Sequence, residues 1–210
     1  VWVPLASTRD GQEILGRRLS LPSSYQITKD PVFGNEMAYF EIQDPKKETI
    51  NFEVNYQAKV AKNAFLKSHP RENEKDLDLY LRQTRLMVIT DEVKKRTRET
   101  TTPSQPEKEK AKNVYDSVIL RMVYDKQTPG WGNGDSKRAC LLGRGNCTDF
   151  HSLFISMMQV ANVPARFKIG LTIPNEAAGE ISGYHCWAEY YEPEKCVQVV
   201  RVGHRREVYR

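Results

Sequence analysis

A cysteine and a histidine occur where a nucleophile and a proton carrier could meet. The stretch 143–147 reads Gly-Arg-Gly-Asn-Cys and leads into an apolar helical pattern, so Asn146 is a good N-cap and Cys147 falls in the first turn of a helix. Unpaired backbone N–H groups and the positive end of the helix dipole favour a thiolate there. The glycines at 143 and 145 would let substrate and backbone approach closely, as an oxyanion site requires. His185 lies on a predicted strand further along the chain and could serve as the base.

The cysteines also have structural interpretations. Cysteine is among the most buried residue types, so the residues alone leave Cys147 open between a reactive thiol and a packing residue. The apolar stripe of its helix begins only at Phe150, which places Cys147 at the margin of that stripe. Cys140, Cys186 and Cys196 are expected to be packing residues, since their spacing does not indicate a disulfide framework.

His151 follows Cys147 by four residues, on the same side of the predicted helix. It could be a metal ligand, a second catalytic histidine or a partly buried histidine with a hydrogen bond, and the last is the expected case. A zinc site built from Cys147, His151 and either Cys186 or His185 is an alternative. The chain has no Cys-x₂-Cys pair, so no metal site is predicted.

The periodicity of the second half predicts helices followed by antiparallel strands. Ser104 is expected to cap a helix that reaches Met122, with Glu107 completing a capping box. The helix after Asn146 should end before Val163-Pro164, because proline disfavours helix in the residue before it. Alternation predicts strands at 165–173 and 184–191, the second with Cys186, Ala188 and Tyr190 on one face. This order indicates an α+β domain.

The first sixty residues read as β-structure. Apolar and polar residues alternate without a break from 49 to 60, which predicts a half-buried antiparallel strand. A strand at 36–42 precedes it, with a turn at 44–47 between them. We therefore expect a small β-sandwich-like domain at 1–68, a linker with short helices at 69–103 that begins in the polar stretch 69–75, a second domain at 104–195 and an atypical basic tail at 196–210.

Composition limits the function classes. The 210 residues are 39% apolar and 28% charged, which suits a globular chain, and no apolar run is long enough for a membrane span. The net charge of +5 comes mostly from the last sixteen residues, so no nucleic-acid face is expected. The chain begins Val-Trp-Val-Pro, without a visible leader, and neither its native ends nor its oligomeric state can be read.

Three separated motifs resemble the transglutaminase-like domain of bacterial proteins. They are Gly-Arg-Gly-Asn-Cys-Thr-Asp-Phe at 143–150, Pro-Ala-Arg at 164–166 and Gly-Tyr-His-Cys-Trp-Ala-Glu at 183–189, preceded by Met-Val-Tyr-Asp at 122–125 and Gly-Trp-Gly at 130–132. The resemblance covers about residues 100–195. It implies a papain-like fold in which the helix bearing the cysteine packs on an antiparallel sheet. It also implies an exported or periplasmic protein that acts on protein or peptide substrates without a cofactor.

Carried onto this chain, the resemblance makes Cys147 the nucleophile and His185 the general base. Trp131 and Trp187 would line the groove, and Trp131 could aid the oxyanion. The family's third residue is an aspartate on the next strand, but Arg201 occupies that position and 196–210 contains no Asp. The third residue is therefore unassigned. The pattern stops abruptly after residue 195, which favours a shifted reading frame over a degenerate end.

The expected chemistry is attack of the Cys147 thiolate on a carboxamide or peptide carbonyl to give a thioester. If water accepts the acyl group, the enzyme is a protease or deamidase. If an amine accepts it, the enzyme is a transglutaminase, and the sequence does not distinguish these cases. A catalytically inactive peptide-binding module with the same fold is the alternative that the missing aspartate favours.

Overall fold

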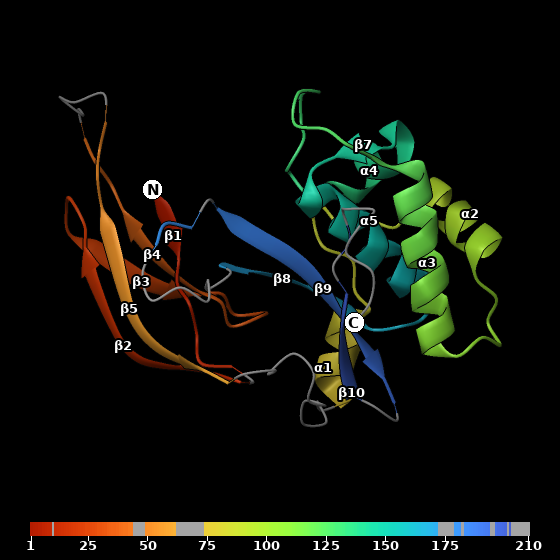
Figure 1. Ribbon diagram of the computed structural model, residues 1–210, viewed down its shortest axis with the longest axis horizontal. Coiled ribbons are helices and arrows are strands. Elements are labelled where there is room, and N and C mark those ends of the chain that lie inside the picture. Colours follow the sequence, from red (N-terminus) through yellow and green to blue (C-terminus); the bar gives the residue numbers. More distant parts are fainter. Residues whose placement is uncertain are drawn as a thin grey trace. The chain divides into compact units, whose positions relative to one another are not determined.

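A computed structural model describes residues 1–9, 11–43, 49–61, 74–171, 179–181, 183–193, 196–200 and 202. The chain divides into two compact units, Val1–Lys67 and Ser68–Arg210. The first holds only strands among its described elements, and the second holds helices and a sheet (Figure 1). The turn predicted at 44–47 and most of the polar stretch predicted at 69–75 lie outside the described residues.

The first unit contains two antiparallel sheets. One has the order β1-β4-β3 and the other is the pair β2-β5. Phe40 and Phe52 bring the two sheets together with 5.7 Å between ring centroids, and Arg17 pairs with Glu36 across them at 2.9 Å. The strands are β1 (Trp2–Pro4), β2 (Gln12–Ser20), β3 (Tyr25–Lys29), β4 (Glu36–Phe40) and β5 (Glu53–Val60).

The predicted half-burial of residues 49–60 is wrong. Phe52, Tyr56 and Val60 are 44%, 38% and 42% exposed. The physical reason is that β5 pairs only with β2, and this two-stranded sheet is too narrow to cover a continuous apolar face. Among the described residues of this unit, the buried apolar side chains are Leu5, Ala38 and Phe40.

The second unit is built around α5 (Cys147–Val160). Helices α2, α3 and α4 pack on it from one side, and the antiparallel sheet β10-β9-β8 covers the other (Figure 1). A helix that carries the cysteine and packs on an antiparallel sheet is the predicted architecture, which is confirmed. The other elements are α1 (Glu74–Tyr80), α2 (Asp91–Thr100), α3 (Glu107–Arg121), β6 (Val123–Tyr124), α4 (Ser136–Leu142), β7 (Arg144–Gly145), β8 (Ala165–Leu171), β9 (Tyr184–Glu192) and β10 (Cys196–Val200).

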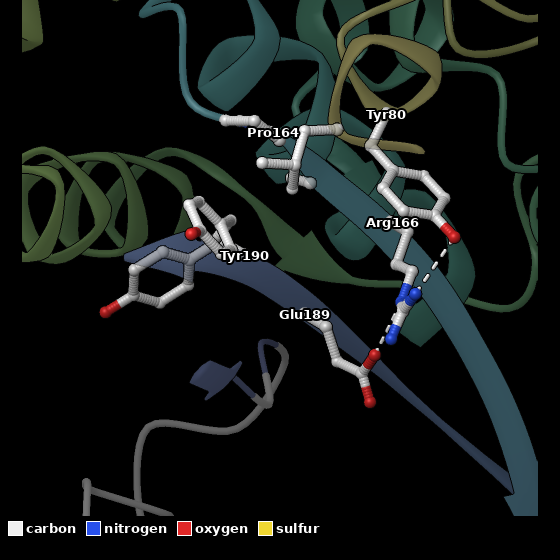
Figure 2. A pocket seen from close by; sticks show the side chains of 8 residues that line it. Tyr80, Pro164, Arg166, Glu189 and Tyr190 are labelled. Atoms are coloured by element: carbon white, nitrogen blue, oxygen red, sulfur yellow. Dashed lines mark hydrogen bonds and ion pairs between the residues drawn. The ribbon is translucent and has the colours of Figure 1, made fainter. Parts of the chain in front are cut away.

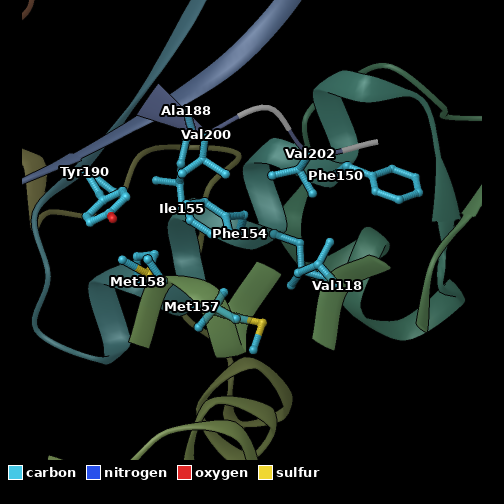
Figure 3. Close-up of a cluster of buried hydrophobic side chains, with 14 of the residues drawn as sticks. Val118, Phe150, Phe154, Ile155, Met157, Met158, Ala188, Tyr190, Val200 and Val202 are labelled. Carbon is cyan, nitrogen blue, oxygen red and sulfur yellow. The ribbon is translucent and has the colours of Figure 1, made fainter. Parts of the chain in front are cut away.

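Helix α5 is buried on all sides from Asp149 to Gln159. Phe154, Ile155 and Met158 lie between the helices and the sheet, where they meet Ala188 and Tyr190 of β9 (Figure 3). Burying each large side chain of this kind contributes about 1.5–3 kcal/mol. A helix held this way cannot shift easily, so the residues at its start have fixed positions.

Helix α3 begins differently from the prediction. Its first residue is Glu107, Pro106 occupies the N-cap position, and no side chain caps the helix. Ser104 lies two residues too early, and its hydroxyl is 3.4 Å from that of Thr102 in the preceding turn. The proline at the N-cap position fixes an extended φ and makes the serine unnecessary for starting the helix.

The segment 196–200 forms β10, antiparallel to β9, with Val200 opposite Ala188. Val200 and Val202 are 3% and 1% exposed and belong to the core of the second unit. Residue 201 and residues 203–210 lie outside the described part of the chain. None of the described helices has the length and apolar character that crossing a bilayer requires.

Candidate active site at the start of α5

Helix α5 starts at Cys147 because the residue before it caps the helix end. Asn146 is extended, and its side-chain oxygen accepts a hydrogen bond from the Thr148 N–H at 2.9 Å. The carboxylate of Asp149 accepts one from the Asn146 N–H, also at 2.9 Å. The two side chains form a capping box. The predicted N-cap is confirmed, and Cys147 is the first helical residue.

Asp149 fixes the loop in front of the helix. Besides the Asn146 N–H, its carboxylate accepts hydrogen bonds from the N–H groups of Gly132 at 2.7 Å and Gly134 at 3.1 Å. The side chain is fully buried, so these donors replace the water it gives up. The carboxylate therefore positions both the first turn of α5 and the loop that carries Trp131.

The two glycines before the cysteine have structural roles. A Cβ at Gly145 would lie 2.2 Å from Oδ2 of Asp149, so this position must stay a glycine for the carboxylate to fit. Gly143 ends α4 in the left-handed region with φ 62°, where a side chain would also meet the Arg121 carbonyl at 2.8 Å. These glycines therefore allow the close approach of protein groups, namely the Arg121 backbone carbonyl and the Asp149 carboxylate; that they also admit substrate stays a prediction.

A second cysteine lies against the first. Sγ of Cys147 is 3.5 Å from Sγ of Cys186, which comes from the face of β9 that packs on α5. The Thr148 hydroxyl is 3.6 Å from the same Cys186 sulfur. Cys186 was predicted to be a packing residue; it is buried, and it also touches the proposed nucleophile.

These neighbours make Cys147 an acidic thiol. Its hydrogen bond to Cys186, its hydrogen bonds to Thr148 and the positive charge of Lys126 lower the pKa of the Cys147 thiol to about 6, although burial raises it. The position at the helix N-terminus acts in the same direction. A thiol with this pKa is mostly thiolate at neutral pH, and the thiolate is the nucleophilic form.

The surroundings of Cys147 also offer an oxyanion donor and an open surface. In the described part of the chain, no hydrogen bond uses the Cys147 N–H, as is usual for the first residue of a helix. A hollow of about 440 Å³ is lined by residues 123–128 and Arg144. Lys126 lies there between two exposed rings, 5.9 Å from the centroid of Tyr124 and 6.0 Å from that of Trp131.

His185 is partly buried on β9, one residue before Cys186. Because neighbouring side chains on a strand point to opposite faces, His185 shares a face with Trp187, away from α5. The indole of Trp187 covers Gly170 on β8, which is paired with His185. The structure thus brings Cys147 to Cys186 directly and places His185 beside that contact on the same strand.

The face of β9 that carries His185 and Trp187 also carries Glu189, which forms ion pairs with two residues of β8. Nε of Arg166 donates to Glu189 at 2.7 Å, and its Nη1 donates to the Tyr80 hydroxyl at 2.9 Å (Figure 2). Lys168 adds a second cation 3.5 Å from Glu189. The cavity beside them has about 10 Å³, enough for about one water molecule. These residues join α1 to the sheet and leave no room for a substrate.

Both ring nitrogens of His151 have structural partners. Nδ1 is 2.6 Å from the Cys147 carbonyl, and Nε2 accepts a hydrogen bond from the Val202 N–H at 2.9 Å. A buried, hydrogen-bonded histidine is the predicted case, which is confirmed. Within the described residues no three histidine, cysteine or carboxylate side chains lie together as metal ligands. The zinc alternative does not fit this geometry because His151 has no nitrogen left for a metal.

Three features of the site were missed from the sequence. Cys186 was assigned to packing, although its alternation with Ala188 and Tyr190 already placed it on the face toward the helix. Asp149 was passed over, although an acidic residue three positions after an N-cap is the sign of a capping box. No sequence pattern identifies Lys126. Arg201, at the position of the family's aspartate, lies outside the described residues.

Comparison with known proteins agrees with this architecture. Residues 94–197 match the transglutaminase-like superfamily. An uncharacterized protein of Haemophilus influenzae is 28% identical over 102 residues, which cover 39% of this chain and 28% of that protein. The chain thus spans less than a third of the length of this relative.

Two solved structures share the fold. A protein of Cytophaga hutchinsonii named as a candidate cysteine protease is 14% identical, with a TM-score of 0.66 over 96% of this chain and 74% of that one. The periplasmic domain of TgpA from Pseudomonas aeruginosa, bound to ethylmercury, is 14% identical, with a TM-score of 0.58 over 95% of this chain and 67% of that one. At this identity the likeness concerns the fold alone. The match to the transglutaminase-like superfamily at residues 94–197 thus covers the unit in which the cysteine-bearing helix packs on an antiparallel sheet.

Proposed function

We propose that this chain is a cysteine-dependent acyl transferase or amide hydrolase with Cys147 as its nucleophile. The observation that carries the proposal is the environment of the Cys147 sulfur. It lies in the first turn of α5, is partly accessible, and has a thiol pKa lowered to about 6 by Cys186, Thr148 and Lys126. The match of residues 94–197 to the transglutaminase-like superfamily supports the same chemistry.

In the proposed reaction the Cys147 thiolate attacks the carbonyl carbon of a carboxamide or peptide bond. The Cys147 N–H is placed to donate a hydrogen bond to the oxyanion that forms. Collapse of this intermediate expels the amine, which takes up a proton, and leaves a thioester on Cys147. An acceptor then cleaves the thioester and restores the thiolate.

His185 is the proposed proton carrier. The neighbours that lower the pKa of Cys147 are Cys186, Thr148 and Lys126, so the thiolate does not depend on a histidine base. The proposed role of His185 is therefore to protonate the leaving amine and then to activate the acceptor. For this the imidazole must reach the α5 side of β9. His185→Gln should therefore slow turnover and leave alkylation of Cys147 unchanged.

The acceptor decides between the two activities. Water would give hydrolysis of a peptide or deamidation of glutamine, and a primary amine would give a transglutaminase. Cys147 is partly accessible to solvent. Since water then reaches the thioester, we propose that hydrolysis predominates.

A glutamine-containing peptide, incubated with the full chain with and without a primary amine, tests the proposal. We expect ammonia release and a peptide adduct on Cys147 that is seen by intact-mass analysis after acid quenching. Cys147→Ala should show neither, and the matched variant Cys140→Ala should keep both. Equal turnover by wild type and Cys147→Ala would overturn the proposal.

A peptide-binding module without turnover is the second candidate function. The observation that favours it is the placement of His185 on the face of β9 away from α5. This candidate predicts that Cys147→Ala binds the same peptide as tightly as wild type, with no ammonia released by either protein. Ammonia release by wild type excludes it.

A further inference from the structure

The contact between Cys147 and Cys186 joins two cysteines from distant parts of the chain, and neither is in a disulfide. Their sulfur atoms are 3.5 Å apart, although 39 positions separate them in the sequence. One sulfur comes from the first turn of α5 and the other from β9, and both elements are anchored in the core. In the proposed acyl transfer only the Cys147 sulfur forms a covalent bond, and Cys186 contributes by lowering the pKa of the Cys147 thiol.

The two thiols differ in access. Cys147 is partly exposed, whereas Cys186 is 2% exposed and lies beneath it. A dissolved oxidant therefore meets Cys147 first, and the lowered pKa of this thiol provides the reactive thiolate. Cys186 is already in contact with whatever forms on Cys147.

We infer that Cys147 and Cys186 form a reversible disulfide when the protein meets a hydroperoxide such as hydrogen peroxide. In the first step the Cys147 thiolate attacks one peroxide oxygen, the O–O bond breaks, and a sulfenic acid and hydroxide result. In the second step the Cys186 sulfur attacks the Cys147 sulfur, the S–O bond breaks and water leaves. The two cysteines are oxidised by two electrons and the peroxide is reduced by two.

The geometry requires little movement. A disulfide bond is about 2.05 Å long, so the sulfur atoms must approach by about 1.5 Å from their 3.5 Å separation. Rotation about the side-chain bonds of the two cysteines can supply much of this. The Thr148 hydroxyl, 3.6 Å from the Cys186 sulfur, borders the same space and does not lie between the two thiols.

The disulfide has two consequences for the protein. It removes the nucleophile, so activity should stop until a dithiol reductant restores it; this consequence rests on the proposed function. It also consumes the sulfenic acid before a second peroxide can oxidise it irreversibly to the sulfinic acid. Disulfide formation itself depends only on the two thiols and is measured without any substrate.

The test treats the full reduced chain with hydrogen peroxide and maps the products by mass spectrometry. We expect the loss of two hydrogens, a cross-linked peptide pair containing Cys147 and Cys186, and full reversal by dithiothreitol. Cys186→Ala also loses the hydrogen bond that lowers the Cys147 pKa, so the two proteins are compared at equal consumption of the Cys147 thiol. The variant should then give sulfenic and sulfinic acid on Cys147 instead, with about tenfold more dimedone adduct than wild type. Cys140→Ala should behave as wild type.

Other outcomes overturn the inference. These are sulfinic acid on Cys147 of the wild type in the same yield as in Cys186→Ala, or a disulfide that joins Cys147 to Cys140 or Cys196. Circular dichroism of reduced Cys186→Ala establishes that the variant is folded, and Cys186→Ser serves in its place if it is not. If the disulfide forms but no peptide is turned over by the reduced chain, the proposed function fails and this inference stands.

Discussion

Helices α4 and α5 follow one another along the chain, and each carries one cysteine in a different chemical state. Cys140 lies inside α4, is 2% exposed, and has a thiol pKa raised by burial. Cys147 lies at the first position of α5, is partly exposed, and has a thiol pKa lowered to about 6. The difference teaches that the position within the helix and the neighbouring groups set thiol reactivity, and the residue type alone does not.

The largest expected effect is on catalytic turnover, which should depend on Cys147 and not on Cys140. Cys147→Ala removes the proposed nucleophile and should lower turnover by about 10³-fold or more, whereas Cys140→Ala should stay within about threefold of wild type. Ammonia release from a glutamine-containing peptide is the measurement. A comparable loss in both variants would show that folding rather than chemistry had been lost.

The rate of alkylation compares the reactivity of the Cys147 and Cys140 thiols without a substrate. Only the thiolate reacts, so the rate at Cys147 should rise with pH, reach half its maximum near the pKa of about 6 and then level off. Cys140 has a raised thiol pKa and should be at least about a hundredfold slower at pH 7. Iodoacetamide labelling mapped by mass spectrometry measures both sites at once. Faster labelling of Cys140 than of Cys147 would contradict the assignment of Cys147 as the more reactive thiol.

A smaller effect is expected from the glycine that makes room for Asp149. Gly145→Ala forces a methyl group to within 2.2 Å of the Asp149 carboxylate and should cost about 1–3 kcal/mol in the free energy of unfolding. Gly179→Ala is the matched control, because a Cβ there meets no atom within 4 Å. Urea unfolding of the three proteins measures the costs. Equal stability of Gly145→Ala and Gly179→Ala would contradict the placement of the carboxylate.

The smallest expected effect comes from removing the side chains that cap helices α5 and α4. Asn146 caps α5 and Asp135 caps α4, each by accepting a backbone hydrogen bond. Replacing either by alanine should cost about 1 kcal/mol. Only Asn146→Ala should also raise the pKa of the Cys147 thiol, because it loosens the turn that carries that sulfur. The pH profile of alkylation measures this, and an unchanged profile would mean that Cys186, Thr148 and Lys126 set the pKa unaided.

Local patterns were enough to predict the start of α5 and the face of β9. Asn146 before an apolar helical pattern defines the N-cap, and alternation puts Cys186 on the same face as Ala188 and Tyr190. The resemblance to the transglutaminase-like superfamily was likewise evident from the motifs around Cys147, and the family match at residues 94–197 includes them. These features depend on residues close together in the sequence.

The features that were missed depend on tertiary contacts. The meeting of Cys147 with Cys186 requires β9 to dock on α5. Two of the three N–H donors to Asp149 require a loop fifteen to seventeen residues upstream to fold back. The exposure of β5 follows from its single pairing partner, which alternation along one strand cannot reveal. Ser104 does not cap the helix because α3 begins at Glu107, which leaves Pro106, a residue without a capping side chain, at the N-cap position.

The imidazole of His151 links the end of the described chain to the carbonyl of Cys147. One nitrogen contacts that carbonyl and the other accepts the Val202 N–H, inside a fully buried environment. During synthesis on the ribosome, α5 emerges long before Val202, so this donor is missing until the chain has passed residue 202. A truncated chain that ends before Val202 lacks this donor and should hold the His151 ring, and with it the Cys147 carbonyl, less firmly.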